Sequence, residues 1–297
     1  MILPTFFVAG CQKCATTSMH YLLTQHQKTF LPTRKESKFF VIDERYDRGL
    51  EYYSRNFDKK NDEIAIGEVD PDYIYFKRAL IRIKKHFDIH GLKFIFIFRN
   101  PVERAFSHYL MTYRRGIETK SFADAIDCEQ ERINVDFFSK MHFSYTDRGF
   151  YHRQLLPFME ILRPDQMLFL LTEDLKSHRD IVLKKCFEFL GVDNNFPCIE
   201  TDTVYHKATI PRSNFLLNEI VRKQDTFPKK IVRLLIPKTT LRHKIRAKIL
   251  ESNQTSDTRK ISLPKKEQLR LIALYGEENK KLATLLGRDL SHWNQIV

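Results

Sequence analysis

Apolar residues form three short runs that predict buried β-strands, at residues 5–9, 92–98 and 167–171. The run at 92–98 (LKFIFIF) has six apolar residues in seven, which is typical of a central strand in a parallel sheet. Apolar residues at helical spacing predict helices over five further ranges: 16–26, 72–88, 150–162, 177–190 and 264–286. Strands that alternate with helices predict an α/β fold, with helices on both faces of a central parallel sheet.

Charge changes this picture in one segment. The 297 residues include 50 Lys and Arg against 37 Asp and Glu, a formal net charge of +13, which favours anionic partners. Twelve basic residues and only three acidic ones fall between 221 and 260, so this segment carries most of the excess. We interpret 221–260 as a basic helical insertion in a single domain that spans residues 1–297.

Cysteine usage and hydropathy indicate the compartment. Five cysteines, at 11, 14, 128, 186 and 198, form an odd and scattered set, which favours reduced thiols over a disulfide framework. No apolar run approaches the roughly 20 residues of a membrane-spanning helix, and none resembles a signal-peptide core. We therefore expect a cytoplasmic protein, with peripheral contact with an inner membrane as a further option.

The segment between the first predicted strand and helix suits an anion. It reads GCQKCATTS over residues 10–18, and the amides and dipole at a helix start favour negative charge. We expect anion binding by Lys13 and by the residues that follow it, Cys14, Ala15, Thr16, Thr17 and Ser18.

Three alternatives for this loop remain open. The ATPase form G-x-x-x-x-G-K-[ST] is absent, because Lys13 precedes the small residue instead of following it, and the usual magnesium ligand is missing. The segment could be only an N-capped helix with a solvated Lys13. Cys11 and Cys14 also spell C-x-x-C, a redox pattern in other contexts.

A second phosphate site is predicted at the end of the 92–98 strand. Arg99 follows the strand, Asn100-Pro101 starts a helix, and Ser107 lies about two turns into that helix. Arg99 can contact a phosphate in bidentate fashion, and ligands bind at the carboxyl edge of parallel sheets. The alternative is that Arg99 merely pairs with Glu103.

Together these segments resemble sulfotransferases that use 3'-phosphoadenylyl sulfate (PAPS). The first is similar to their K-x-G-T-T loop, with Ala15 in place of the usual Gly, and the second to R-[DN]-P-x-x-R-x-x-S. Residues 35–40 (KESKFF) resemble K-E-x-x-F-F of the heparan-type branch. Residues 67–73 (GEVDPDY) resemble its G-E-K-[ST]-P-x-Y, with Val69 where a lysine often sits. Residues 206–213 are similar to a late nucleotide loop, and 287–293 (GRDLSHW) to the tail of bacterial members.

The resemblance covers about residues 5–293 and implies a P-loop-like fold, PAPS as the donor and no metal. Glu36 is then the general base, with its pairing to neighbouring lysines as the alternative role. His108 is a rival base, although it lies about 100° around the helix from Ser107. The resemblance implies that Lys13 neutralises charge on the leaving phosphate. It also implies that four further residues hold the nucleotide: Arg99, Ser107, Lys207 and Arg212.

The acceptor is the least defined part of this interpretation. A glycan or glycolipid hydroxyl is the first expectation, a polyketide, peptide tyrosine or small alcohol remains open, and no nucleic-acid partner is expected. The rival functions are a nucleotide or small-molecule kinase and a basic protein that binds polyanions or membrane with a degenerate nucleotide site. Residues 228–250 favour a membrane contact, because Leu241, Ile245 and Ile249 form one apolar stripe between basic side chains.

Overall fold

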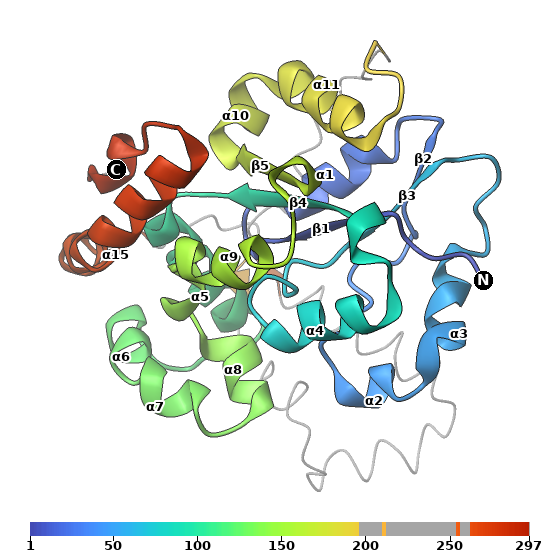
Figure 1. The fold of residues 1–297 in the computed structure, drawn as a ribbon. Coiled ribbons are helices and arrows are strands. Elements are labelled where there is room, and N and C mark those ends of the chain that lie inside the picture. Colours follow the sequence, from blue (N-terminus) through green and yellow to red (C-terminus); the bar gives the residue numbers. More distant parts are fainter. Residues whose placement is uncertain (196–209, 212–253, 256–261, 297) are drawn as a thin grey trace, which may run out of the picture. The chain divides into compact units, whose positions relative to one another are not determined.

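A computed structural model describes residues 1–195, 210–211, 254–255 and 262–296 (Figure 1). Lys207 and Arg212 lie outside these residues, as does nearly all of the basic segment 221–260. The expected single domain with an insertion therefore stays a prediction. The chain divides into two compact units, which are described separately. The first comprises Met1–Arg104, Asp147–Tyr205 and Leu269–Val297, and the second Ala105–Thr146 and His206–Gln268.

The first unit is built on a five-stranded parallel sheet, which confirms the predicted central sheet. Its order is β2–β3–β1–β4–β5. The three strands predicted from apolar runs are β1, β4 and β5. The bounds are Phe6–Gly10 for β1, Thr29–Phe30 for β2, Ala65–Val69 for β3, Lys93–Phe98 for β4 and Met167–Leu171 for β5.

Helices lie on both faces of this sheet, as predicted. In Figure 1, α1 and α11 lie on one face and α4 and α9 on the other. The bounds are Thr16–Leu23 for α1, Asp43–Tyr46 for α2, Gly49–Ser54 for α3, Lys77–His86 for α4, Tyr151–Met159 for α9, Thr172–Ser177 for α10, Arg179–Leu190 for α11 and Lys265–Leu286 for α15. The helix expected over 72–88 begins only at Lys77, because turns occupy residues 70–76. In these turns the side chains of Asp70 and Asp72 pair with Lys38.

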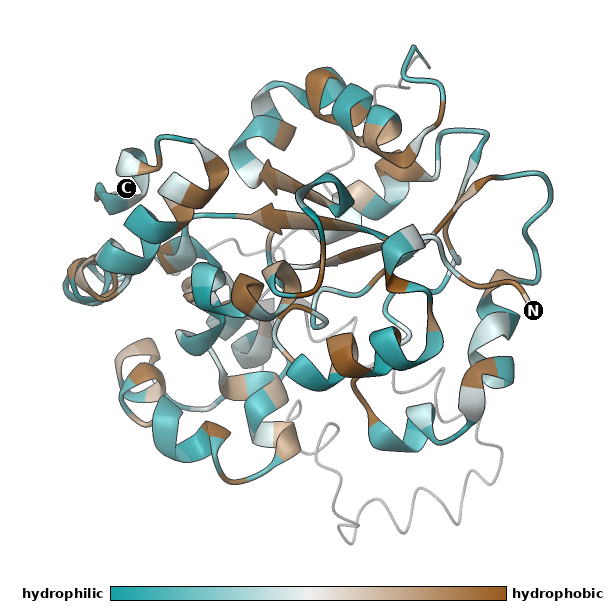
Figure 2. Ribbon diagram, viewed as in Figure 1, coloured by the Kyte–Doolittle hydropathy of each residue, from teal (hydrophilic) through white to brown (hydrophobic). Residues whose placement is uncertain are grey.

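The core of this unit is aromatic. Phe94 and Phe96 of β4 pack against Phe158 of α9, with ring centroids 5.7 and 5.1 Å apart. On the other face, His26 packs against Phe187 of α11. Figure 2 shows the central strands as mainly hydrophobic, whereas hydrophobic and hydrophilic residues alternate along the helices. Burial on both faces explains why these strands appear in the sequence as continuous apolar runs.

The second unit is helical over residues 105–146. Helix α5 (Pro101–Arg114) begins in the first unit, and α6 (Phe122–Asp127), α7 (Glu129–Ile133) and α8 (Phe137–Phe143) follow. Its buried Glu118 pairs with Arg132 at 2.7 Å and accepts a hydrogen bond from Tyr145 at 2.8 Å. Two-residue strands β6 (Ile210–Pro211) and β7 (Gln254–Thr255) pair antiparallel.

Candidate active site

The loop between β1 and α1 has the expected strand–loop–helix form. Its residues Cys11 and Cys14 are buried, and the Cys14 amide closes a turn on the Cys11 carbonyl at 3.2 Å. Ala15 precedes α1 with φ 59°, in the left-handed region. That conformation costs a residue with a Cβ about 1–2 kcal/mol, so glycine suits this position better. The Ala15 departure therefore has a backbone cost in addition to any crowding of a bound anion.

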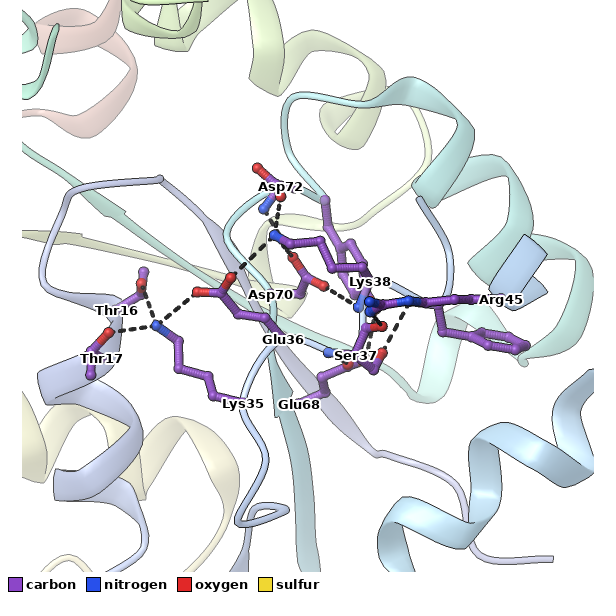
Figure 3. A network of polar contacts seen from close by, with 12 residues as sticks. Thr16, Thr17, Lys35, Glu36, Ser37, Lys38, Arg45, Glu68, Asp70 and Asp72 are labelled. Carbon is purple, nitrogen blue, oxygen red and sulfur yellow. Dashed lines mark hydrogen bonds and ion pairs between the residues drawn. The ribbon is translucent and has the colours of Figure 1, made fainter. Parts of the chain in front are cut away.

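Lys35 links this loop to the predicted base. Its Nζ donates to Thr17 Oγ1 at 2.6 Å and to Thr16 Oγ1 at 3.3 Å, and it lies 3.1 Å from Glu36 Oε1 (Figure 3). Burial lowers the pKa of Lys35, although the neighbouring Glu36 opposes this. In the sequence Lys35 stands out only as a neighbour of Glu36, and no local pattern predicts its contacts with the loop hydroxyls.

The Glu36 segment is held against the end of β3 by three consecutive amides. Glu36 N donates to the Val69 carbonyl at 3.2 Å, Ser37 N to Glu68 Oε1 at 3.2 Å, and Lys38 N to Asp70 Oδ2 at 2.8 Å. The second oxygen of Glu68 accepts hydroxyl hydrogen bonds from two buried tyrosines, Tyr53 at 2.6 Å and Tyr73 at 2.8 Å. The acidic residues of the GEVDPDY segment thus position the loop that carries Glu36.

A buried charge cluster lies beside this loop. Lys38 Nζ is 3.1 Å from Glu36 Oε2 and 3.5 Å from Asp70 Oδ1, and it also pairs with Asp72. The other oxygen of Asp72 pairs with Arg148, which is almost fully buried. Figure 3 shows Lys35 and Lys38 approaching the Glu36 carboxylate from opposite sides.

These contacts set the ionisation of the acids. Burial raises the pKa of Glu36, but the charges of Lys38 and Lys35 outweigh it and hold the pKa below its usual value. Glu36 is therefore ionised at neutral pH. Burial, opposed by Lys38, raises the pKa of Asp70 to about 7. Asp72 is equally buried, yet Lys38 and Arg148 hold its pKa well below the usual range, so Asp72 stays ionised.

Unusual backbone conformations also gather here. Among the residues that the structure describes, four non-glycine residues have positive φ: Lys13 at 68°, Ala15 at 59°, Glu36 at 63° and Lys38 at 55°. All four belong to the two loops just described. Such conformations persist only where the surroundings enforce them, and they concentrate at functional sites.

The residues of the second predicted phosphate site lie at the end of β4 and on α5, and their role stays a prediction. Arg99 lies at the end of β4, where Nη2 and Nε contact Glu103 Oε2 at 2.7 and 3.0 Å. Its Nη1 also donates to the Lys13 carbonyl at 3.4 Å, which brings the two predicted phosphate sites together. Ser107 lies on α5 in the second unit, and its pairing with Arg99 stays a prediction. His108, the rival base, is fully buried.

The C-terminal tail supports the residue after Arg99. Asn100 Nδ2 donates to the Trp293 carbonyl at 3.2 Å, and the indole Nε1 of Trp293 donates to Glu173 Oε1 at 2.8 Å. Arg288 pairs with Asp174 at 2.9 Å in the same region. The GRDLSHW segment therefore anchors the tail beside the end of β4.

Comparison with known proteins decides the family. A family model described as the sulfotransferase domain matches residues 3–210, more than half of the chain. The chain belongs to the sulfotransferase domain family. A crystal structure of a sulfotransferase from Alicyclobacillus acidocaldarius superposes with a TM-score of 0.71 at 23% identity, over 99% of this chain and 100% of that one. That likeness confirms the P-loop-like sulfotransferase fold.

Curated relatives of this sulfotransferase-domain chain match smaller parts of it. The membrane-associated sulfotransferase kil1 of Dictyostelium discoideum is 32% identical over 112 residues, 37% of this chain and 23% of that protein. Mouse heparan sulfate glucosamine 3-O-sulfotransferases 3A1 and 3B1 are each 26% identical over 190 residues, 64% of this chain and 46% of theirs. The chain thus spans less than half the length of these relatives.

The described residues also bear on metal binding and membrane spanning. Within residues 1–195 and 262–296, no three His, Cys, Asp or Glu side chains gather in a way that could hold a metal ion. None of the helices in the described part of the chain is long and apolar enough to cross a membrane.

Proposed function

We propose that this chain transfers a sulfuryl group from PAPS to an acceptor hydroxyl, with Glu36 as general base. We call the segment 10–18, between β1 and the start of α1, the donor loop. The observation that carries the proposal is the position of Lys35, whose ammonium contacts both the hydroxyls of Thr16 and Thr17 in this loop and the Glu36 carboxylate. A base beside an anion-binding loop is the arrangement that in-line transfer between a bound donor and an acceptor hydroxyl requires.

The residues present fit this donor. Its sulfate and 5'-phosphate would lie at the start of α1, and Lys13 would neutralise the charge that grows on the leaving phosphate. Glu36 would take the acceptor proton as the acceptor oxygen bonds to sulfur and the bond from sulfur to the phosphate oxygen breaks. Arg99 would turn from Glu103 to the 3'-phosphate, with Ser107, Lys207 and Arg212 as further ligands.

A glycan or glycolipid hydroxyl is the proposed acceptor. The KESKFF and GEVDPDY segments support it, because they resemble the heparan-type branch, and two mouse relatives are named for heparan sulfate glucosamine. A small cavity of about 40 Å³, which is too small for a sugar ring, also lies next to the Glu36 loop. Its lining includes two arginines and no acid: Arg34, Ser37, Phe39, Arg45, Tyr52 and Asn56.

The rival functions receive less support. A kinase would use the G-K-[ST] pattern that this loop lacks. A polyanion-binding protein would need neither a base nor a strained donor loop, whereas positive φ values gather at Lys13, Ala15, Glu36 and Lys38.

The direct test is transfer of labelled sulfate. Wild type and Glu36→Gln are incubated with [35S]PAPS and a panel of desulfated glycans, glycolipids and phenols. We expect label in one acceptor class and a rate about 10²-fold lower in Glu36→Gln, with unchanged affinity for adenosine 3',5'-bisphosphate. Equal rates for the two proteins would remove Glu36 as base and direct attention to His108. No transfer to any acceptor, together with no bisphosphate binding, would overturn the proposed function.

A further inference from the structure

Position 69 leaves the active site without a cation that the resembled sequence pattern contains. Val69 ends β3 directly beside the base, since its carbonyl accepts the Glu36 amide hydrogen bond at 3.2 Å. Its side chain is apolar and only 2% exposed, so it contributes no charge. Any second ammonium for Glu36 must therefore come from another position.

We propose that Lys38 is this second cation, a positioning residue that orients Glu36 and keeps it ionised. The inference rests on the proposed role of Glu36 as base. Each lysine contacts a different oxygen of the Glu36 carboxylate: Lys35 Nζ is 3.1 Å from Oε1, and Lys38 Nζ is 3.1 Å from Oε2. Two cations on opposite oxygens fix the carboxylate orientation, because rotation about the terminal bond would lengthen both pairs.

Lys38 is anchored in a way that Lys35 is not. Its amide donates to Asp70 at 2.8 Å, and its ammonium pairs with both Asp70 and Asp72. Two fully buried carboxylates need compensating cations: Arg148 pairs with Asp72, and Lys38 pairs with both Asp70 and Asp72. The left-handed φ of 55° at Lys38 indicates that the loop conformation is enforced, so that this ammonium reaches both the aspartates and the base.

The two lysines consequently have separate roles. Lys35 shares its charge with the hydroxyls of Thr16 and Thr17, where the donor sulfate would lie. Lys38 has no such contact with the donor loop among the hydrogen bonds of the described residues, and its carboxylate partners keep it charged. Burial lowers the pKa of Lys38, but Asp70, Asp72 and Glu36 outweigh that effect and raise it above its usual value. Lys38 therefore stays on Glu36 when Lys35 turns to the donor.

The test measures the Glu36 carboxyl directly. The protein is labelled with 13C at glutamate carboxyls, the Glu36 signal is assigned by its loss in Glu36→Gln, and its titration is followed by NMR. The groups that face this carboxyl are Lys35, Lys38, Asp70 and Asp72. We expect the pKa of Glu36 to rise by about one unit or more in Lys38→Met and to stay near wild type in Lys38→Arg.

Two further variants guard against loss of folding. Lys38→Met leaves Asp70 and Asp72 with less compensation, so Lys38→Met/Asp70→Asn removes the cation together with one of its carboxylates. Lys38→Met/Val69→Lys moves the ammonium to the position that lacks it, and it should lower the pKa of Glu36 again. Circular dichroism and binding of adenosine 3',5'-bisphosphate report whether each variant is folded. An unchanged pKa of Glu36 in a folded Lys38→Met protein would overturn the inference.

Kinetics separate this inference from the function on which it rests. With a labelled acceptor in hand, the acid limb of kcat/KM should move to higher pH in Lys38→Met, while KM for the donor changes less than about threefold. A merely structural lysine would lower the rate at every pH and leave the limb in place. If Glu36→Gln is inactive but Lys38→Met matches wild type, only this inference fails. If Glu36→Gln is fully active, the proposed function of Glu36 fails.

Discussion

Around Glu36, individual charges are balanced by other side chains instead of solvent. Four acidic and three basic residues meet there, namely Glu36, Glu68, Asp70 and Asp72 with Lys35, Lys38 and Arg148. Acids exceed cations by one, and burial disfavours an uncompensated charge. Burial therefore raises the pKa of two of these carboxyls, Glu68 and Asp70, and that of Asp70 reaches about 7.

The pH dependence of stability should report Asp70. The folded protein holds this proton up to about pH 7, whereas an unfolded chain loses it near about pH 4. The contribution of Asp70 to the free energy of unfolding is thus fully present below about pH 4 and lost as pH rises through about 7. Urea unfolding between about pH 5 and 8 should show a smaller decline in Asp70→Asn than in wild type.

The exposed Asp43 provides the control for this experiment. Its pKa is lowered, chiefly by a hydrogen bond from Arg82, so it titrates below this range and Asp43→Asn should keep the wild-type slope. Parallel pH profiles for wild type and Asp70→Asn would show that Asp70 is already ionised at pH 5.

Lys13 should be essential for turnover. Lys13→Ala removes the charge that neutralises the leaving phosphate, so we expect loss of detectable transfer and weaker donor binding, an effect of several kcal/mol on the transition state. Lys84→Ala, an exposed lysine on α4, is the matched control and should behave as wild type. A steady-state rate for Lys13→Ala within about threefold of wild type would refute the phosphate-loop assignment.

At the scale of elements, the strands show what sequence can and cannot reveal. β1 and β4 are predictable because both their faces are buried and their sequences are almost wholly apolar, and the edge strand β5 is predictable because its five residues are all apolar, although three are only partly buried. β3 has the same burial as β1 but was not predicted, because Gly67 and Glu68 interrupt its apolar pattern. Tertiary contacts explain why these two residues occur in a buried strand. The Phe6 ring fills the space beside Gly67, and the hydroxyls of Tyr53 and Tyr73 donate hydrogen bonds to Glu68.

The close approach at Gly67 gives a stability prediction. A Cβ there would overlap the ring of Phe6, which is fully buried in the core and cannot move outward. Gly67→Ala should therefore lower the free energy of unfolding by about 1–3 kcal/mol, as overpacking does. Gly91→Ala is the matched control, since nothing lies within 4 Å of its Cβ position. Equal urea midpoints for the two variants would show that the β1–β3 packing is looser than described.

The same reasoning applies to the site. Short local motifs point to Lys13, Glu36 and Arg99 as candidates, and their roles stay predictions. The charged residues that surround Glu36 cannot be predicted in the same way. Arg148 contacts Asp72 across 76 residues of sequence, and no local pattern indicates such a contact. The Arg99–Glu103 pair, which the sequence offers as an alternative role for Arg99, is present in the structure.

At the scale of the whole molecule, the excess of positive charge suggests an anionic surface as partner. The basic segment 228–250 lies outside the described residues, so its helical form stays a prediction. We expect the protein to cosediment with anionic but not neutral liposomes, because each cation near such a surface adds about 1 kcal/mol. Deleting 228–250 should abolish sedimentation. Absence of the intact protein from both pellets would leave the segment without a membrane role.

Nucleotide preference is the most direct test of whether this chain binds a 3'-phosphorylated donor. Calorimetry compares adenosine 3',5'-bisphosphate with adenosine 5'-phosphate, which differ only at the 3'-phosphate. Charge-assisted hydrogen bonds contribute roughly 1.5–3 kcal/mol each, so two or three of them predict a preference of about 10²-fold or more for the bisphosphate. Arg99→Ala should erase most of this preference and barely change 5'-phosphate binding, whereas Glu103→Gln should retain it. Equal affinities of the wild type for both nucleotides would contradict the account.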